Sequence, residues 1–200
     1  MRNIGILLAF LIALASRTAL GDEKPLDYTD NDFHFGFQFP QSWKIQPNPP
    51  SSDSSQTRVL IQSPTKTMYV TALVGNIGKS VSKERYDANP KKDELLQGMI
   101  QLTIDQVYEK LAHQVGADQF KVAETKPIDY GVGFGFYIST LETFHGSPMV
   151  IFGQHVVPFD KPYVISFIEI MPFDAKATED NETATNILNS FHLIGEKPQP

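Results

Sequence analysis

Hydrophobic and polar residues alternate strictly near the start of the chain, in the stretch FHFGFQF at 33–39. Its four phenylalanines occupy every second position and are separated by a histidine, a glycine and a glutamine. Because successive side chains of a strand point to opposite faces, this period of two predicts a strand with a buried aromatic face. Pro40 ends the strand, and we expect Trp43 to cap the same core.

Apolar runs rich in β-branched residues predict six more strands. Two of them, at 57–63 and 67–77, are separated by a short turn and predict a hairpin. The other four follow in close succession, at 119–128, 131–144, 148–159 and 162–171. A parallel pair needs a long crossover, so these short connections predict antiparallel neighbours.

In two segments the apolar residues recur every three to four positions, which predicts helices. The longer helix is expected at 92–115, ahead of Gly116, and its apolar stripe consists of Leu95, Leu96, Met99, Ile100, Ile104, Val107, Leu111 and Val115. The shorter helix is expected at 174–191. The elements together predict an α+β fold: an antiparallel sheet of about six to seven strands with one long and one shorter helix packed on it.

Two polar, turn-rich segments are expected to be exposed loops. The first, at 47–56, holds three prolines and four serines in ten residues and cannot pack into a core. The second, at 76–92, is locally basic because of Lys79, Lys83, Arg85, Lys91 and Lys92. Long loops on a rigid sheet often carry binding function, so the second loop either steers an acidic partner or is solvated without one.

The N-terminal residues predict export. Arg2 precedes an apolar run of about 12 residues, which fits a secretory signal and is shorter than the roughly 20 residues that span a bilayer. Small residues at Ala19 and Gly21 favour cleavage before Asp22, with a cut after Ala15, a buried helix or an uncleaved anchor as the alternatives.

This pattern divides the chain into a signal peptide at 1–21, a flexible acidic lead-in at 22–32, a single domain at 33–195 and a disordered tail at 196–200. Loss of residues 1–21 would remove two arginines and no acidic residue, so the net charge would change from −6 to −8. An acidic chain is a poor partner for nucleic acid and for anionic membranes, and neither is expected. After cleavage we expect a soluble protein without membrane insertion.

The chain contains no cysteine. This absence excludes disulfides, thiolate metal ligands, cysteine nucleophiles and the lipid-anchored cysteine of a bacterial lipoprotein.

The order of elements resembles the PsbP/DcrB-like family: an aromatic strand ending in F-P-x-x-W, a hairpin, one long helix, a strand meander and a short helix ending in N-S-F-x-L. The residues that carry the resemblance are Phe37, Phe39, Pro40, Trp43, Lys44, Asn189, Ser190, Phe191 and Leu193. The resemblance implies an α/β/α sandwich that serves as a binding or assembly module, usually without catalysis. It supplies no catalytic residues, and fold alone does not give function.

The glycines of GVGFGF do not have the spacing of a nucleotide site. A dinucleotide loop needs G-x-G-x-x-G at a strand-to-helix turn, whereas here the sequence continues as a strand. We expect Gly131, Gly133 and Gly135 to leave room for a helix on one face, or to mark a bulge, with Phe134 and Phe136 on the other face.

Histidines and carboxylates are the remaining candidates for chemistry. The histidines, His34, His113, His145, His155 and His192, show no H-x-x-x-H spacing, so no metal or other cofactor is expected. Glu142 and Glu169 lie within apolar strands. They either reach water at the sheet surface or, with His145 and His155, form an unfamiliar acid–base site.

These observations favour an exported, non-catalytic binding or assembly accessory protein of the cell envelope. We expect its partner to be another envelope protein or a small ligand, and the sequence assigns no catalytic, cofactor-binding or metal residue. Two alternatives remain. One is a hydrolase-like enzyme that uses Glu142, His145, His155 or Glu169, and the other is a small-ligand carrier whose cavity lies between the long helix and the sheet.

Overall fold

The computed structural model describes residues 24–48, 55–109, 112–113, 117, 119–144, 146–172 and 178–194. The expected signal peptide and C-terminal tail lie outside these residues, as do most of the loop at 47–56, Gly116 and His145. No helix in the described part of the chain is long and apolar enough to cross a membrane.

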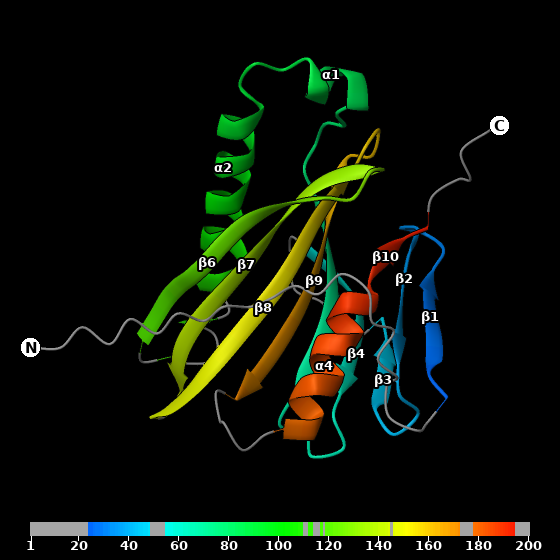
Figure 1. Ribbon diagram of the computed structural model, residues 1–200, viewed down its shortest axis with the longest axis vertical. Helices are drawn as coiled ribbons and strands as arrows, with labels where there is room; N and C mark the ends of the chain where they lie inside the picture. The colour runs from blue at the N-terminus through cyan, green and yellow to red at the C-terminus, as the bar shows by residue number, and fades with distance from the viewer. Residues whose placement is uncertain are drawn as a thin grey trace, which may run out of the picture.

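A seven-stranded sheet forms the centre of the molecule (Figure 1). Its strands, in spatial order, are β3 (Lys44–Pro47), β4 (Ser55–Gln62), β5 (Tyr69–Asn76), β9 (Tyr163–Pro172), β8 (Ser147–Pro158), β7 (Gly133–Phe144) and β6 (Gln119–Asp129). Every neighbouring pair is antiparallel, as the short connections predict. The predicted fold class is confirmed.

A smaller sheet is built from β1 (Leu26–Asp30), β2 (Phe35–Phe39) and β10 (His192–Leu193). The prediction of a flexible lead-in at 22–32 needs correction, because residues 26–30 pair with β2 over its whole length. Tyr28 stacks on Phe37 with ring centroids 4.9 Å apart, so an apolar contact holds this acidic segment in place. Three of the four alternating phenylalanines are buried in β2, whereas Phe33 lies in the preceding turn.

A buried ion pair fastens the small sheet to β4. Arg58 Nε donates to Asp30 Oδ2 at 2.7 Å, and its Nη2 reaches Asp32 Oδ2 at 2.6 Å. Asp30 Oδ1 also accepts from the backbone N–H groups of Asp32 and Phe33 at 3.0 Å. The charge of Asp30 is thus compensated by a cation and by two amides, as a buried carboxylate requires.

Helical segments lie on both faces of the large sheet and at one end of it (Figure 1). The short α1 (Lys83–Asp87) lies within the loop predicted at 76–92, and the Ser82 side chain caps it by accepting from the Arg85 amide. The long helix begins as α2 (Lys92–Thr103) and continues into a π-helical turn, η1 (Ile104–Tyr108). The second predicted helix is α4 (Thr178–Ser190), and residues 174–177 lie outside the described part.

The two long helices lie on opposite faces of the large sheet, and each covers its own core. The core under α4 includes Phe37, Trp43, Phe167, Ala184 and Ile187. The core under α2 and η1 is formed by Leu96, Ile100, Ile104, Tyr108, Phe134, Phe136, Ile138, Ile151, Val157 and Ile168. The alternation of each strand therefore divides the side chains of β7, β8 and β9 between two separate layers.

Candidate functional site

On the face covered by η1, three buried polar side chains form a continuous hydrogen-bonded chain. The Tyr108 hydroxyl lies 2.8 Å from His155 Nε2, and His155 Nδ1 lies 2.8 Å from Ser166 Oγ. Neutral imidazole has one donor and one acceptor nitrogen, and both hydroxyls can take either role. Each of the three groups therefore has at least one hydrogen-bond partner inside the protein.

Local backbone features bring these three residues together. His155 lies on β8 directly opposite Ser166 on β9, so the sheet register sets one of the two contacts. Tyr108 is the last residue of the π-helical turn, and Gly153, which shares its face with His155, leaves the space for the tyrosine hydroxyl. A β-carbon at position 153 would collide with that hydroxyl and lie 2.7 Å from His155 Nε2.

Burial determines the protonation states of the hydrogen-bonded side chains. It lowers the pKa of His155 to about 3, so the imidazole is neutral at physiological pH. Burial also raises the pKa of the Tyr108 hydroxyl well above its usual value. Ser166 has a histidine neighbour but no carboxylate beyond it, and all three groups are shielded from substrate. The arrangement is suited to fixing the helix on the sheet and not to nucleophilic catalysis.

Glu169 lies on the opposite face of the sheet from His155. It pairs with Phe152 on β8, three residues from His155, and strand alternation therefore directs it toward α4. Its side chain is fully buried and neither carboxyl oxygen has a hydrogen-bond partner. Burial raises the pKa of Glu169 to about 8. The acid is thus predominantly neutral at pH 7.

Glu142 shares a face with His155 but lies far from it. The β7 residue opposite His155 is Phe136, six residues from Glu142, which corresponds to roughly 20 Å along a strand. Burial raises the pKa of Glu142, and Thr140 Oγ1 donates to its Oε1 at 3.4 Å. Glu142, His155 and Glu169 therefore do not converge on one site, and His145 lies outside the described residues.

The glycines of β7 make room for a tyrosine ring and for neighbouring backbone, where we expected a helix or a bulge. A β-carbon at Gly135 would meet the His155 carbonyl and the Tyr130 ring, and one at Gly133 would meet the Val157 carbonyl at 2.6 Å. The bulge near this strand pair lies in β6, between Val122 and Glu124. Phe134 and Phe136 share the opposite face, as expected.

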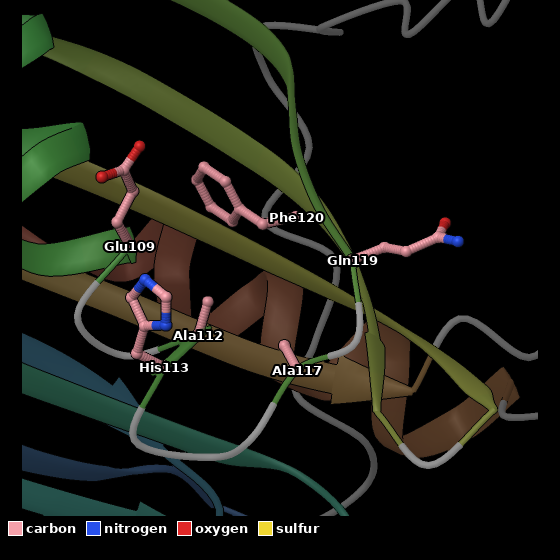
Figure 2. Close-up of a pocket in the computed structure, with 6 residues that line it drawn as sticks. All are labelled: Glu109, Ala112, His113, Ala117, Gln119 and Phe120. Carbon is pink, nitrogen blue, oxygen red and sulfur yellow. The ribbon is translucent and has the colours of Figure 1, made fainter.

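An open pocket of about 290 Å³ lies where the long helical segment ends and β6 begins. Its lining residues are Glu109, Ala112, His113, Ala117, Gln119 and Phe120. Figure 2 shows Glu109, His113 and Phe120 around the pocket, whereas the Gln119 side chain points away from it. The lining combines one aromatic ring, that of Phe120, with the carboxylate of Glu109 and the imidazole of His113.

The basic segment at 76–92 is more structured and less basic than its sequence suggests. Lys83 pairs with Asp87 at 2.6 Å across one turn of α1, and Lys91 pairs with Glu94 at 3.2 Å. Two of the five cations are thus neutralised by nearby acids. The described residues contain no group of three or more histidine, cysteine, aspartate or glutamate side chains that could hold a metal ion.

Sequence reasoning missed Tyr108. The predicted apolar stripe omits it, although it lies four residues after Ile104 and therefore falls on the same helical face. The spacing predicts its burial, but its hydrogen bond to His155 depends on the widened turn and on the glycine beneath it.

The comparisons with known proteins find this architecture in solved structures. No family model and no curated protein matches the sequence. The solution structure of cyanobacterial PsbP (CyanoP) from Synechocystis sp. PCC 6803 matches with a TM-score of 0.57 and 14% identity, over 90% of this chain and 98% of that one. LpqN of Mycobacterium tuberculosis matches with a TM-score of 0.50 and 13% identity, over 85% and 90% of the two chains.

The Ran-binding protein Mog1p of Saccharomyces cerevisiae shows a weaker likeness, with a TM-score of 0.49 and 8% identity, over 86% of this chain and 96% of that one. At these identities the likeness concerns the fold alone. The predicted resemblance is confirmed at that level: this chain has a PsbP-like fold.

Proposed function

We propose that this protein is an exported, non-catalytic binding or assembly accessory of the cell envelope. The observation that carries the proposal is the separation of the candidate catalytic groups: Glu142 and His155 lie far apart on one face, and Glu169 lies on the other. An acid–base mechanism needs such groups within reach of one substrate.

The fold supports the same conclusion. LpqN, which shares the architecture, is described as involved in cell envelope biogenesis, and the first residues of this chain have the pattern of a secretory signal. A chain without cysteine and with a negative net charge is compatible with an extracytoplasmic, protein-binding role.

Expression of the full chain with a C-terminal tag in a bacterial host tests the export that this function requires. We expect the tagged protein outside the cytoplasm, with a mature N-terminus at Asp22. A matched variant with Leu7→Arg and Leu11→Arg should stay inside uncleaved, because charges disrupt the apolar part of the signal. Recovery of the wild-type chain in the cytoplasm with residues 1–21 attached would contradict the proposal.

Catalysis is tested on the purified mature protein with ester, glycoside and phosphate substrates. We expect no turnover above that of a heat-unfolded control. Turnover that disappears in Glu169→Gln or in Glu142→Gln would overturn the non-catalytic part of the proposal.

The pocket beside Phe120 favours a second candidate function, the carriage of a small ligand. It lies between the end of the long helical segment and the start of β6. A thermal-shift screen with small organic compounds should then give hits that depend on this pocket. Ala117→Leu fills the pocket and should abolish them, whereas Ala88→Leu, an exposed position after α1, should not.

A further inference from the structure

Glu169 occupies an apolar layer between the large sheet and α4. Its neighbours on the same face of β9 are Phe167 and Met171, which pack in one core with Ala184 and Ile187 of α4. The Glu169 side chain is 0% exposed, and both of its carboxyl oxygens lack a hydrogen-bond partner. A carboxyl group in such a layer is stable when it is protonated and is strongly disfavoured when it is charged.

No described cation pairs with this acid; on the same face, Lys126 of β6 lies with its Nζ 4.8 Å from the ring centroid of Tyr137. The adjacent strands present Val70 from β5 and Phe152 from β8, and β7 contributes Ser139 and Tyr137. Tyr137 is the one titratable group among these four, and burial raises the pKa of its hydroxyl, so it remains neutral where Glu169 titrates.

From α4, the inward stripe described by the structure consists of Asn181, Ala184, Ile187 and Leu188, which carry no charge. Asn181 Oδ1 is itself buried without a hydrogen-bond partner. This acceptor cannot compensate a negative charge on Glu169, since it carries a partial negative charge of its own. Charging Glu169 therefore requires that water reach it.

Among the elements around Glu169, α4 is the one held by the weakest connections. Strands β5 and β8 are joined to β9 by backbone ladders along their length. The contact of α4 with the large sheet consists of apolar packing and a 3.4 Å hydrogen bond from Gln154 Nε2 to the Leu188 carbonyl, and at the end of the helix Ser190 Oγ accepts from the Gln38 amide of β2 at 2.8 Å. An opening that hydrates Glu169 therefore costs least if α4 moves and the strands stay in place.

We propose that α4 is a pH-dependent cover of the sheet. While Glu169 is protonated, α4 packs closely on β9, and ionisation of Glu169 loosens the helix and exposes the apolar residues beneath it. This device is independent of the proposed function, because it concerns the state of the fold and not the identity of a partner. Burial raises the pKa of Glu169 from 4.5 to about 8, so the packed position of α4 loses stability as the pH rises toward 8.

Hydrogen exchange of the intact mature protein between pH 6 and pH 9 tests the cover, with rates corrected for intrinsic exchange. In the wild type, the protection factors of α4 amides should fall at least tenfold between pH 6 and pH 8 and level off above pH 8, while those of β8 stay constant. The single tryptophan, Trp43, is buried in the core under α4 and should report the same reversible transition by fluorescence.

Glu169→Gln should abolish both changes, because its side chain is similar in shape and cannot ionise. Glu142→Gln is the matched control, since it removes a buried acid from the opposite face, and it should behave as the wild type. An unchanged transition in Glu169→Gln, or constant α4 protection in the wild type, would overturn the proposal. If Glu169→Gln does not fold, Glu169→Met takes its place, and the wild-type exchange data still decide.

Discussion

The two faces of the large sheet each bury a titratable residue. On one face this residue is hydrogen-bonded, and on the other it has no hydrogen-bond partner. Under η1, His155 is hydrogen-bonded at both ring nitrogens. Under α4, Glu169 has no hydrogen-bond partner at either oxygen. Both groups are neutral at physiological pH because burial disfavours their charged forms.

This difference indicates that burial of a polar core residue and hydrogen bonding of its side chain are separate properties. The hydrogen bonds of His155 with Tyr108 and Ser166 fix one helix to the sheet. The loss of any of these three side chains should destabilise the fold. Glu169 contributes no directed contact, so its replacement by an uncharged residue should stabilise the fold wherever the acid would otherwise ionise. Each prediction below tests one side of this contrast.

The largest expected effect is a pH dependence of opposite sign for the two groups. The pKa of Glu169 is raised from 4.5 to about 8, so its contribution is full below pH 4.5 and is lost as the pH rises to 8. The linked loss is roughly 5 kcal/mol of unfolding free energy. The pKa of His155 is lowered from 6.5 to about 3, so stability is instead lost as the pH falls through that window.

Urea denaturation at intervals from pH 4 to pH 9 measures how the unfolding free energy changes across both pH windows. Glu169→Gln should remove the loss of stability between pH 4.5 and pH 8 and leave the loss below pH 4.5 unchanged. If this variant still loses the full amount of unfolding free energy as the pH rises to 8, then other groups produce the loss.

A smaller effect is expected from Tyr108→Phe. The substitution leaves His155 Nε2 buried without its partner at 2.8 Å, which should lower the unfolding free energy by about 2 kcal/mol at pH 7. Tyr163→Phe is the matched control, because it removes a longer, partly exposed hydrogen bond to the Phe33 carbonyl, and it should cost less. Equal losses of unfolding free energy in the two variants would contradict the structural importance of the hydrogen bond between Tyr108 and His155.

The smallest expected effect is that of Ser166→Ala, about 1 kcal/mol. His155 then keeps its bond to Tyr108 and loses the one at Nδ1. Combined with Tyr108→Phe, the loss should be non-additive, since both hydroxyls bind the same ring. Strict additivity in a denaturation cycle would indicate that the three groups do not act as a unit.

The fold could be predicted well from the sequence because its signals are local. The alternation in 33–39 and the helical stripe from Leu95 onward each describe one element, and short links such as Asp160–Lys161 determine the antiparallel order. The strand at Leu26–Asp30 was missed because its acidic residues conceal the Tyr28 contact with Phe37. The short helix at Lys83–Asp87 was missed because its cap and its i,i+4 pair are weak local signals, and the stacking of Tyr86 on Phe134 joins segments distant in the sequence.

The buried polar groups were found as candidates but could not be placed relative to one another. Because side chains alternate along β8 and β9, His155 and Glu169 lie on opposite faces. This follows only once the register Phe152↔Glu169 is known. Likewise, the contact between Tyr108 and His155 joins residues 47 positions apart in the chain. Pairing between distant segments determines whether such groups form a site, and a single sequence does not specify it.

Carboxyl ¹³C NMR of Glu169 in the folded protein tests the central contrast most directly, with Glu169→Gln used to assign the resonance. A titration from pH 3 to pH 10 should show a midpoint near 8, so that the acid is protonated at pH 7. A midpoint near 4.5 would mean that the charge of Glu169 is solvated or paired in solution, and it would contradict the account of the α4 face given above.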